Sequence, residues 1–391
     1  MKKVCVLLTS SIHKDFRVIK TIQVLSRYCK VDLFYLRPSD SDKELFNENT
    51  RLFALKQRTG KKELFLRHTF FYNEFNYFFF DIIRHEIRYD YVWANDLPAL
   101  KPALFLKKKF NAKLVYDSHE IYIETLNQFF PEKSHGIKKI VFGALLKLMR
   151  FYGSRAERAM VEQTDIFITV SDSVKEYFAA LFNRNDIAVV LNCPSLHQET
   201  YESVDLKSML GFDNQVFLLL YQGVMSYGRG LPLMIEAQKY TDQNIRFVLM
   251  GDGMLKNDLI ELTNRLKLNE KVRFIDRVPT SKLLTYTRAA DGGIILQETD
   301  KNLSKKLGIA NKLFEYMHAG IPFVATNAPE NNAVASKYDI CIIVENNVES
   351  IADGINRLQH LNRGNVKEEA LKASQYYNWE KQEETIKKLI V

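Results

Sequence analysis

The stretch that decides the fold is LGIANKLFEYMHAGIPFVAT, residues 307–326. It predicts a helix that ends at Gly320 and leads directly into an apolar strand. A helix that stops at a glycine and passes into a buried strand is typical of α/β proteins with a parallel sheet. The helix also puts Lys312 and Glu315 three residues apart, on one face. They form either an ordinary surface ion pair or part of a ligand site.

The same alternation of strands and helices runs through all 391 residues. A first set of strands is predicted at 4–10, 31–36, 91–95, 113–118, 165–171 and 187–192, and a second set at 217–223, 245–251, 271–277, 292–297, 322–327 and 340–345. Strands separated by helices predict parallel, doubly wound sheets. We therefore predict an α/β protein with two Rossmann-like domains.

The predicted boundaries follow from where this alternation pauses. Residues 193–212 are rich in polar residues and have little periodicity, so we interpret them as a linker between a first domain, 1–192, and a second, 213–372. The last residues, 373–391, end in an amphipathic helix, and we expect this tail to complete the first domain.

The composition limits the class of protein. A net charge of +8 and a pI of about 9.0 point to anionic partners. The four cysteines lie far apart without a C-x-x-C pair, which argues against a disulfide framework or a zinc site. The start, KKVCVLLTS, is typical of a strand and not of a secretion signal, and no apolar run reaches the length of a membrane span. We expect a cytoplasmic protein.

Two segments combine basic with aromatic or apolar residues: 67–90 and 133–150. Such segments suit aromatics packed into a core, a surface that lies on an anionic membrane or holds a lipid-linked acceptor, or an RNA-binding surface. No RNA-recognition motif accompanies them, so we expect no nucleic-acid partner.

Polar residues that follow the strands are the candidates for ligand contacts, because ligands of open parallel sheets bind beyond the carboxyl ends of the strands. Among these residues of the first domain we single out Ser10, Ser11, Asp96 and His119, and the others are Thr9, Asn95, Asp117, Ser118, Glu120 and Ser171. His119 can donate a hydrogen bond to a substrate hydroxyl or phosphate, or it is a turn residue bonded to backbone. Asp96 is either a ligand contact or a helix N-cap.

In the second domain, Gly223 and Gly251 follow strands and allow a ligand to approach the backbone closely. Arg229, between two glycines, is a candidate phosphate clamp. The first strand–helix turn lacks the G-x-G-x-x-G pattern, and no P-loop sequence occurs, so dinucleotide-dependent and P-loop enzymes are excluded.

The opening stretch completes this second site. The helix that starts near Asn311 presents its positive end to the ligand edge, and Lys312 adds a full charge, which together suit a phosphate. Glu315, one turn on, can accept hydrogen bonds from the two hydroxyls of a ribose. Phosphate followed by ribose predicts a nucleoside diphosphate.

Several segments resemble the retaining GT-B glycosyltransferases of the large family 4 type, the group 1 glycosyl transferases. The matching segments are HKDFRVIK (13–20), WANDLPAL (93–100), VYDSHE (115–120), YQGVMSYGRGL (221–231), VLMGDG (248–253) and NKLFEYMHAGIPFVAT (311–326). The resemblance implies two domains that face a central cleft, with residues 1–192 on the acceptor side and 213–372 binding the nucleotide-sugar donor.

The resemblance also implies site roles. Glu315 would bind the ribose and Arg229 the diphosphate, with Lys312 as the second positive charge. Arg277 and Val278 would hold the base, mainly through their backbone. By the same resemblance, His119 would lie near the transferred sugar on the acceptor side.

The implied reaction is metal-independent hexosyl transfer, with retention, from a sugar linked to UDP or GDP. The acceptor would be a glycan or a lipid-linked molecule in cell-surface polysaccharide synthesis, at the inner face of the membrane. The sequence departs from the family pattern at Leu307, where a first glutamate is usual, at Ser10 and Ser11, where glycines are usual, and at Val224, where an arginine is frequent. A GT-B nucleotide-sugar epimerase and a catalytically silent nucleotide-sugar-binding partner remain as alternatives.

Overall fold

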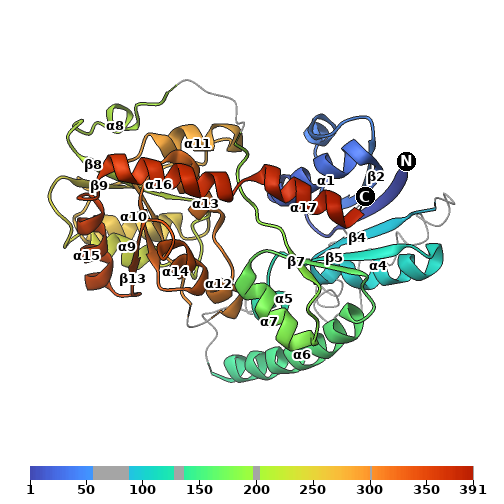
Figure 1. The fold of residues 1–391 in the computed structure, drawn as a ribbon. Coiled ribbons are helices and arrows are strands. Elements are labelled where there is room, and N and C mark those ends of the chain that lie inside the picture. Colours follow the sequence, from blue (N-terminus) through green and yellow to red (C-terminus); the bar gives the residue numbers. More distant parts are fainter. Residues whose placement is uncertain (56–87, 127–135, 197–202, 300–301, 391) are drawn as a thin grey trace. The chain divides into compact units, whose positions relative to one another are not determined.

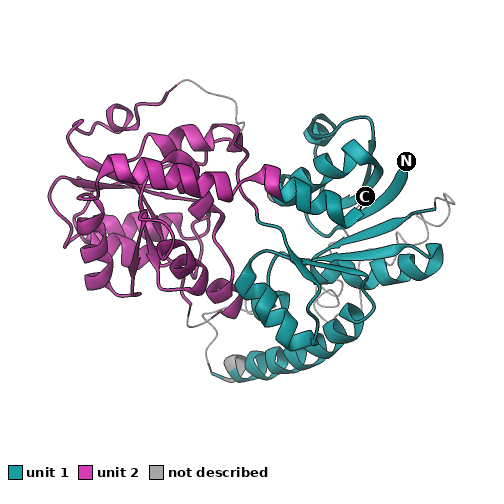
Figure 2. Cartoon of the chain, viewed as in Figure 1, with its two compact units in different colours: residues 1–191, 382–391 teal, residues 192–381 magenta. Residues whose placement is uncertain are grey.

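The computed structural model describes residues 1–55, 88–126, 136–196, 203–299 and 302–390. The chain divides into two compact units, one made of residues 1–191 and 382–391 and the other of residues 192–381 (Figure 2). Each unit is built on one parallel sheet (Figure 1). The predicted pair of parallel α/β sheets is therefore confirmed.

The sheet of unit 1 has seven strands in the order β3-β2-β1-β4-β5-β6-β7, all parallel. They are β1 (Lys2–Leu8), β2 (Cys29–Leu36), β3 (Thr50–Leu55), β4 (Tyr91–Asn95), β5 (Lys113–Asp117), β6 (Ile166–Thr169) and β7 (Ile187–Val189). The strands at the centre are buried on both faces, which explains their continuous apolar sequences.

The helical segments between these strands are η1 (Ile12–Lys14), α1 (Phe16–Tyr28), η2 (Asp40–Leu45), α4 (Asp96–Phe110), α5 (Tyr122–Thr125), α6 (Ile137–Val161) and α7 (Asp172–Phe182). Side chains cap two of them: Asp15 accepts from the Val18 N–H at the start of α1, and Ser171 accepts from the Val174 N–H at the start of α7. Such caps fix where the helices begin.

Unit 2 repeats the plan with six parallel strands in the order β10-β9-β8-β11-β12-β13. The strands are β8 (Phe217–Gln222), β9 (Ile245–Met250), β10 (Val272–Ile275), β11 (Gly292–Ile295), β12 (Phe323–Thr326) and β13 (Cys341–Val344). Its helices are α8 (Leu206–Met209), α9 (Leu231–Ala237), α10 (Lys256–Arg265), α11 (Thr280–Arg288), α12 (Leu303–Leu307), α13 (Asn311–Ala319), α14 (Pro329–Ala335), α15 (Val348–Leu358) and α16 (Arg363–Tyr376). Residues 307–326 contain α13 followed by β12.

One strand of unit 1 is absent from the sequence prediction. The edge strand β3 pairs in parallel with β2 along its whole length. Its sequence, TRLFAL, has a single β-branched residue and a charged one, so it lacks the composition that marks the other strands. Arg51 is tolerated there because its guanidinium binds the buried Asp32, with 2.6 Å between Nη2 and Oδ2.

The chain also divides differently from the predicted boundaries. Residues 193–212, predicted as a linker, belong to unit 2, and so do residues 373–381 of the predicted tail. Helix α17 (Trp379–Ile390) contains the point of division. Its last part is fixed to unit 1, where Lys2 Nζ donates to the carbonyl of Ile390 over 2.6 Å.

The two basic segments singled out in the sequence are described only in part. Residues 67–87 and 133–135 lie outside the described residues. The rest of the second segment falls on α6. Among the described helices, none is long and apolar enough to cross a membrane.

Candidate active site

The carboxyl edge of the unit 2 sheet is shaped by two glycines. Gly223 follows β8 and Gly251 follows β9, and the Gly223 N–H donates to the carbonyl of Met250 over 2.9 Å. Both have positive φ angles, +133° and +147°, and a Cβ on Gly251 would collide with the Gly223 carbonyl oxygen. These positions therefore require glycine, and they leave an exposed backbone at the end of β8.

Lys312, in the first turn of α13, lies beneath this backbone. Its side chain is 7% exposed, and its Nζ lies 3.8 Å from the centroid of the Tyr221 ring. Burial and the neighbouring Arg229 lower the pKa of Lys312 well below its usual value, although Glu315 opposes the shift. Lys312 is thus a desolvated amine whose charged form an anion placed at Gly223 would stabilise.

Glu315 is positioned by a chain of buried side chains. The Gln222 side-chain amide donates to Glu315 Oε2, and the Thr287 hydroxyl donates to Gln222 Oε1 over 2.8 Å. Gln222 and Thr287 are almost fully buried. Because an ionised carboxylate can only accept hydrogen bonds, the N–H end of the amide must face Glu315 and its oxygen must face Thr287. The half-buried carboxylate is therefore held in one orientation at the end of β8.

A second source of positive charge is the loop after β8, residues 223–230. Arg229 lies in this loop, and its Nε donates to Ser226 Oγ over 3.2 Å. Lys305 of α12 donates to the Tyr227 carbonyl over 2.9 Å and so ties the loop to that helix. Helix α13 begins close by without a side-chain cap at Ala310, so its first amides are not bound by a capping side chain. These groups form an electropositive edge suited to phosphate.

The other predicted donor-side residues lie further out. Arg277 and Val278 follow β10, which the sheet order separates from β8 by one strand. Arg277 is exposed, and Asn311 is the exposed first residue of α13. The structure thus brings together Gly223, Gly251, Arg229, Lys312 and Glu315, and it leaves Arg277, Val278 and Asn311 around them.

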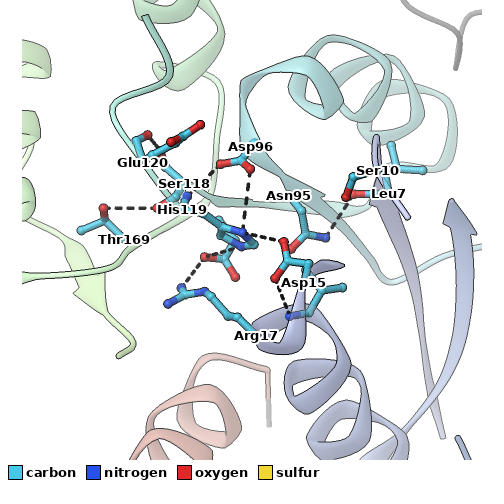
Figure 3. Close-up of polar contacts among 12 residues, drawn as sticks. Leu7, Ser10, Asp15, Arg17, Asn95, Asp96, Ser118, His119, Glu120 and Thr169 are labelled. Carbon is cyan, nitrogen blue, oxygen red and sulfur yellow. Dashed lines mark hydrogen bonds and ion pairs between the residues drawn. The ribbon is translucent and has the colours of Figure 1, made fainter. Parts of the chain in front are cut away.

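In unit 1, His119 lies in a group of carboxylates at the carboxyl edge of the sheet (Figure 3). Its Nδ1 lies 3.1 Å from Asp15 Oδ2 and 3.8 Å from Asp96 Oδ2, and its Nε2 lies 3.6 Å from Asp117 Oδ1. The last distance exceeds a hydrogen bond, and the buried Nε2 has no hydrogen-bond partner within the described parts of the chain. A charged imidazole would therefore hold its second N–H in a buried position near the Asp117 carboxylate.

The charges of this group favour the imidazolium. Burial lowers the pKa of His119, but Asp15, Asp96 and Asp117 together raise it well above its usual value. Burial also acts on Asp117 and would raise its pKa, yet the buried Arg17, bound to its Oδ1, and then His119 bring it down to about 2. The group therefore favours a cationic imidazole beside the carboxylate of Asp117.

The predicted acceptor-side residues also follow strands of the unit 1 sheet. Asp96 has a positive φ of 61°, and its carboxylate accepts the backbone N–H of His119 over 2.8 Å. It thus holds the loop after β5, and the N-cap of α4 is its neighbour Asn95. Ser10 and Ser11 follow β1, and the Ser10 carbonyl accepts the Leu36 N–H over 3.2 Å.

Sequence reasoning left several of these residues out of the site. Gln222 stands at the end of an apolar strand, and its partner Thr287 lies 65 residues away in a helix. Asp117 is among the strand-end residues that the sequence indicates, but its partner Arg17 is buried within α1. A charged or amide side chain inside an apolar run was the available signal, because such groups need buried partners. In the described parts of the chain, no cluster of His, Cys, Asp and Glu could hold a metal ion.

Two parallel-sheet units with ligand edges of this kind define the GT-B class of glycosyltransferases. The family model "Glycosyltransferase Family 4" matches residues 22–196, and "Glycosyl transferases group 1" matches residues 205–377. The chain belongs to the group 1 glycosyltransferases.

Known relatives agree with this family. An uncharacterized glycosyltransferase of Methanocaldococcus jannaschii is 25% identical over 202 residues, 49% of this chain and 50% of that protein. The alpha-monoglucosyldiacylglycerol synthase of Streptococcus pneumoniae is 26% identical over 148 residues, 37% of this chain and 32% of that protein. The matches thus span half or less of these relatives. Anabaena HepE, solved in complex with UDP and glucose, shares the fold with a TM-score of 0.75 at 15% identity, over 100% of this chain and 99% of HepE.

Proposed function

We propose that this glycosyltransferase moves a hexose from a nucleoside-diphosphate sugar to a glycan or lipid-linked acceptor in cell-surface polysaccharide synthesis, with retention of configuration. The donor is a UDP- or GDP-linked sugar, and UDP is favoured by the UDP and glucose bound in HepE. A lipid acceptor is favoured by the similarity to a diacylglycerol-modifying enzyme.

The observation that carries the proposal is that a fixed carboxylate, Glu315, and a buried amine, Lys312, both lie at the end of β8. Gln222 orients Glu315, and Lys312 lies against Tyr221 below Gly223. A ribose that donates both hydroxyls to Glu315 would leave its diphosphate next to Gly223, Arg229 and Lys312. This order of groups matches the order of diphosphate and ribose in the donor.

The chemistry follows from these charges. When the bond between the anomeric carbon and the phosphate oxygen breaks, its electron pair stays on the diphosphate. Arg229, Lys312 and the first amides of α13 stabilise that charge, and no metal ion is required. The acceptor oxygen bonds to the anomeric carbon from the same face, and its proton passes to the departing phosphate oxygen.

On the acceptor side, His119 is the candidate contact. Its imidazolium is held by Asp15, and its buried Nε2 lies 3.6 Å from Asp117 Oδ1. We assign His119 to the acceptor side of the reaction through the charge of this ring. Asp96 positions the ring by accepting a hydrogen bond from the backbone N–H of His119.

The test is incubation with a panel of UDP- and GDP-sugars, with and without lipid-linked acceptors. Transfer with release of the nucleoside diphosphate, and a product of unchanged anomeric configuration by NMR, supports the proposal. Interconversion of free nucleotide-sugars would instead identify an epimerase. Binding without turnover of any donor and acceptor pair would identify a silent partner.

A further inference from the structure

Helix α6 of unit 1 carries a continuous apolar stripe on its exposed side. Its five large members, Ile140, Val141, Leu148, Phe151 and Tyr152, are each 51–73% exposed. At about 100° per residue they fall within an arc of about 120°. The opposite side of the helix is the buried one, at Met149, Gly153, Glu157 and Val161. This helix therefore packs on unit 1 with one face and presents a second apolar face outward.

Basic side chains share that outward face. Lys147, Arg155 and Arg158 are exposed and fall on the same arc or at its edge. The one acidic residue in the sequence of α6 is Glu157, and it is buried. Arg155 stacks on Phe151, with Cζ 4.3 Å from the ring centroid. Apolar, aromatic and basic side chains on one helical face are the composition of a helix that lies in a membrane interface.

A groove adjoins the end of the stripe, between α6, α5 and α7. It has a volume of about 410 Å³, and its lining includes Arg150, Arg155 and Arg158 together with Phe151 and Leu181. Glu124, which also lines it, pairs with Arg150, with 3.0 Å between Oε2 and Nη2. Three guanidinium groups against one carboxylate leave the groove positive, as a lipid phosphate requires.

We propose that α6 docks unit 1 on an anionic membrane surface, with the stripe among the lipid chains and a lipid phosphate in the arginine groove. The helix lies along the edge of unit 1 in Figure 1, where its length can follow a surface. No described helix spans a bilayer, so the contact is interfacial. A second copy fits less well, because a twofold pairing of α6 would bring together two faces that both carry Lys147, Arg155 and Arg158, and like charges repel. The inference concerns a surface separate from the donor site and does not depend on the proposed reaction.

The experiment is co-sedimentation of the full chain with vesicles. We expect binding to phosphatidylcholine vesicles that contain phosphatidylglycerol, weaker binding at high salt, and little binding to phosphatidylcholine alone. Arg155→Glu and Leu148→Glu should each lower the partition coefficient by about fivefold or more. Matched controls are Leu371→Glu, an exposed apolar residue of α16, and Lys388→Glu of α17, and both should bind as the wild type does.

Three outcomes would overturn the inference. The wild type would bind neither kind of vesicle, or the stripe and control variants would lose binding equally. In the third, sedimentation without lipid would find a dimer that Leu148→Glu separates, which would make α6 an interface between copies. Melting curves of each variant ensure that a loss is not caused by unfolding, and Leu148 and Arg155 are exposed enough to be replaced safely.

Discussion

The Gln222 amide donates a hydrogen bond to the carboxylate of Glu315, from the last residue of β8 to the second turn of α13. The amide is itself oriented by Thr287, so three side chains from three elements fix one carboxylate. A buried chain of hydrogen bonds destabilises the fold when one of its members loses its partner. It places a preorganised acceptor where a ribose is expected.

Replacing Gln222 tests this positioning role. Gln222→Leu should weaken nucleoside-diphosphate binding by about 1.5–3 kcal/mol, the scale of a hydrogen bond to a charged group. Thr287→Val should give a smaller loss, because it frees the amide to rotate without removing it. Calorimetric titration measures both. If the double variant Gln222→Leu with Glu315→Ala loses the sum of the two single effects, the residues act separately and the positioning role is wrong.

The ribose-binding role of Glu315 is tested by removing the hydroxyls of the ribose. Glu315→Ala should lose about 1.5–3 kcal/mol of affinity for UDP or GDP. The same variant should bind the 2′,3′-dideoxy diphosphate as well as the wild type does, since that ligand has no hydroxyls to donate. Glu349→Ala, an exposed carboxylate of α15, is the matched control. An equal loss for both nucleotides would remove the ribose assignment.

The lowered pKa of Lys312 makes the stability of the unliganded protein depend on pH. Its folded pKa is lowered, so the unfolded chain binds the extra proton between that pKa and about 10.4, and stability should rise with pH in this window. Lys312→Met should remove this slope and leave the unliganded protein at least as stable. It should also slow transfer by about 100-fold or more, as loss of a preorganised charge does.

The same shift couples nucleotide binding to protons. A diphosphate beside Lys312 favours the ammonium, so binding should take up a proton at pH values above the lowered pKa, and affinity should fall as pH rises through it. Titrations in buffers of different ionisation enthalpy measure the uptake. Proton uptake that persists in Lys312→Met would assign it to another group.

The raised pKa of His119 makes stability depend on pH in the opposite direction. Its folded pKa is raised, so its contribution to stability is complete below about 6.5 and is lost as pH rises through the folded value. In NMR spectra of histidine-labelled protein, the His119 ring should remain charged at neutral pH. Asp15→Asn should lower its pKa, and the control Asp165→Asn, which removes the partner of Lys107, should not. A ring that is neutral at pH 7 in the wild type would refute the cationic assignment.

The strands were predictable because parallel strands buried on both faces have continuous apolar sequences, as in β8. The edge strand β3 was not, since one of its faces tolerates Arg51 paired with Asp32. Glu315 and Gly223 could be placed at the ligand edge from their positions after a helix start and a strand. The partners Gln222 and Thr287 could not, because contacts between residues far apart in sequence depend on how the helices pack on the sheet. Burial of Lys312 against Tyr221 was hidden for the same reason.

The most direct test of the account is a calorimetric comparison of each nucleoside diphosphate with its free nucleoside, UDP against uridine and GDP against guanosine. The account predicts that the wild type binds one diphosphate far more tightly than its nucleoside, and that Arg229→Ala and Lys312→Met lose most of that difference while keeping their weak affinity for the nucleoside. Failure of both diphosphates to bind, or equal losses of diphosphate and nucleoside affinity in the two variants, would contradict the claim that unit 2 holds a nucleotide-sugar donor by its phosphates.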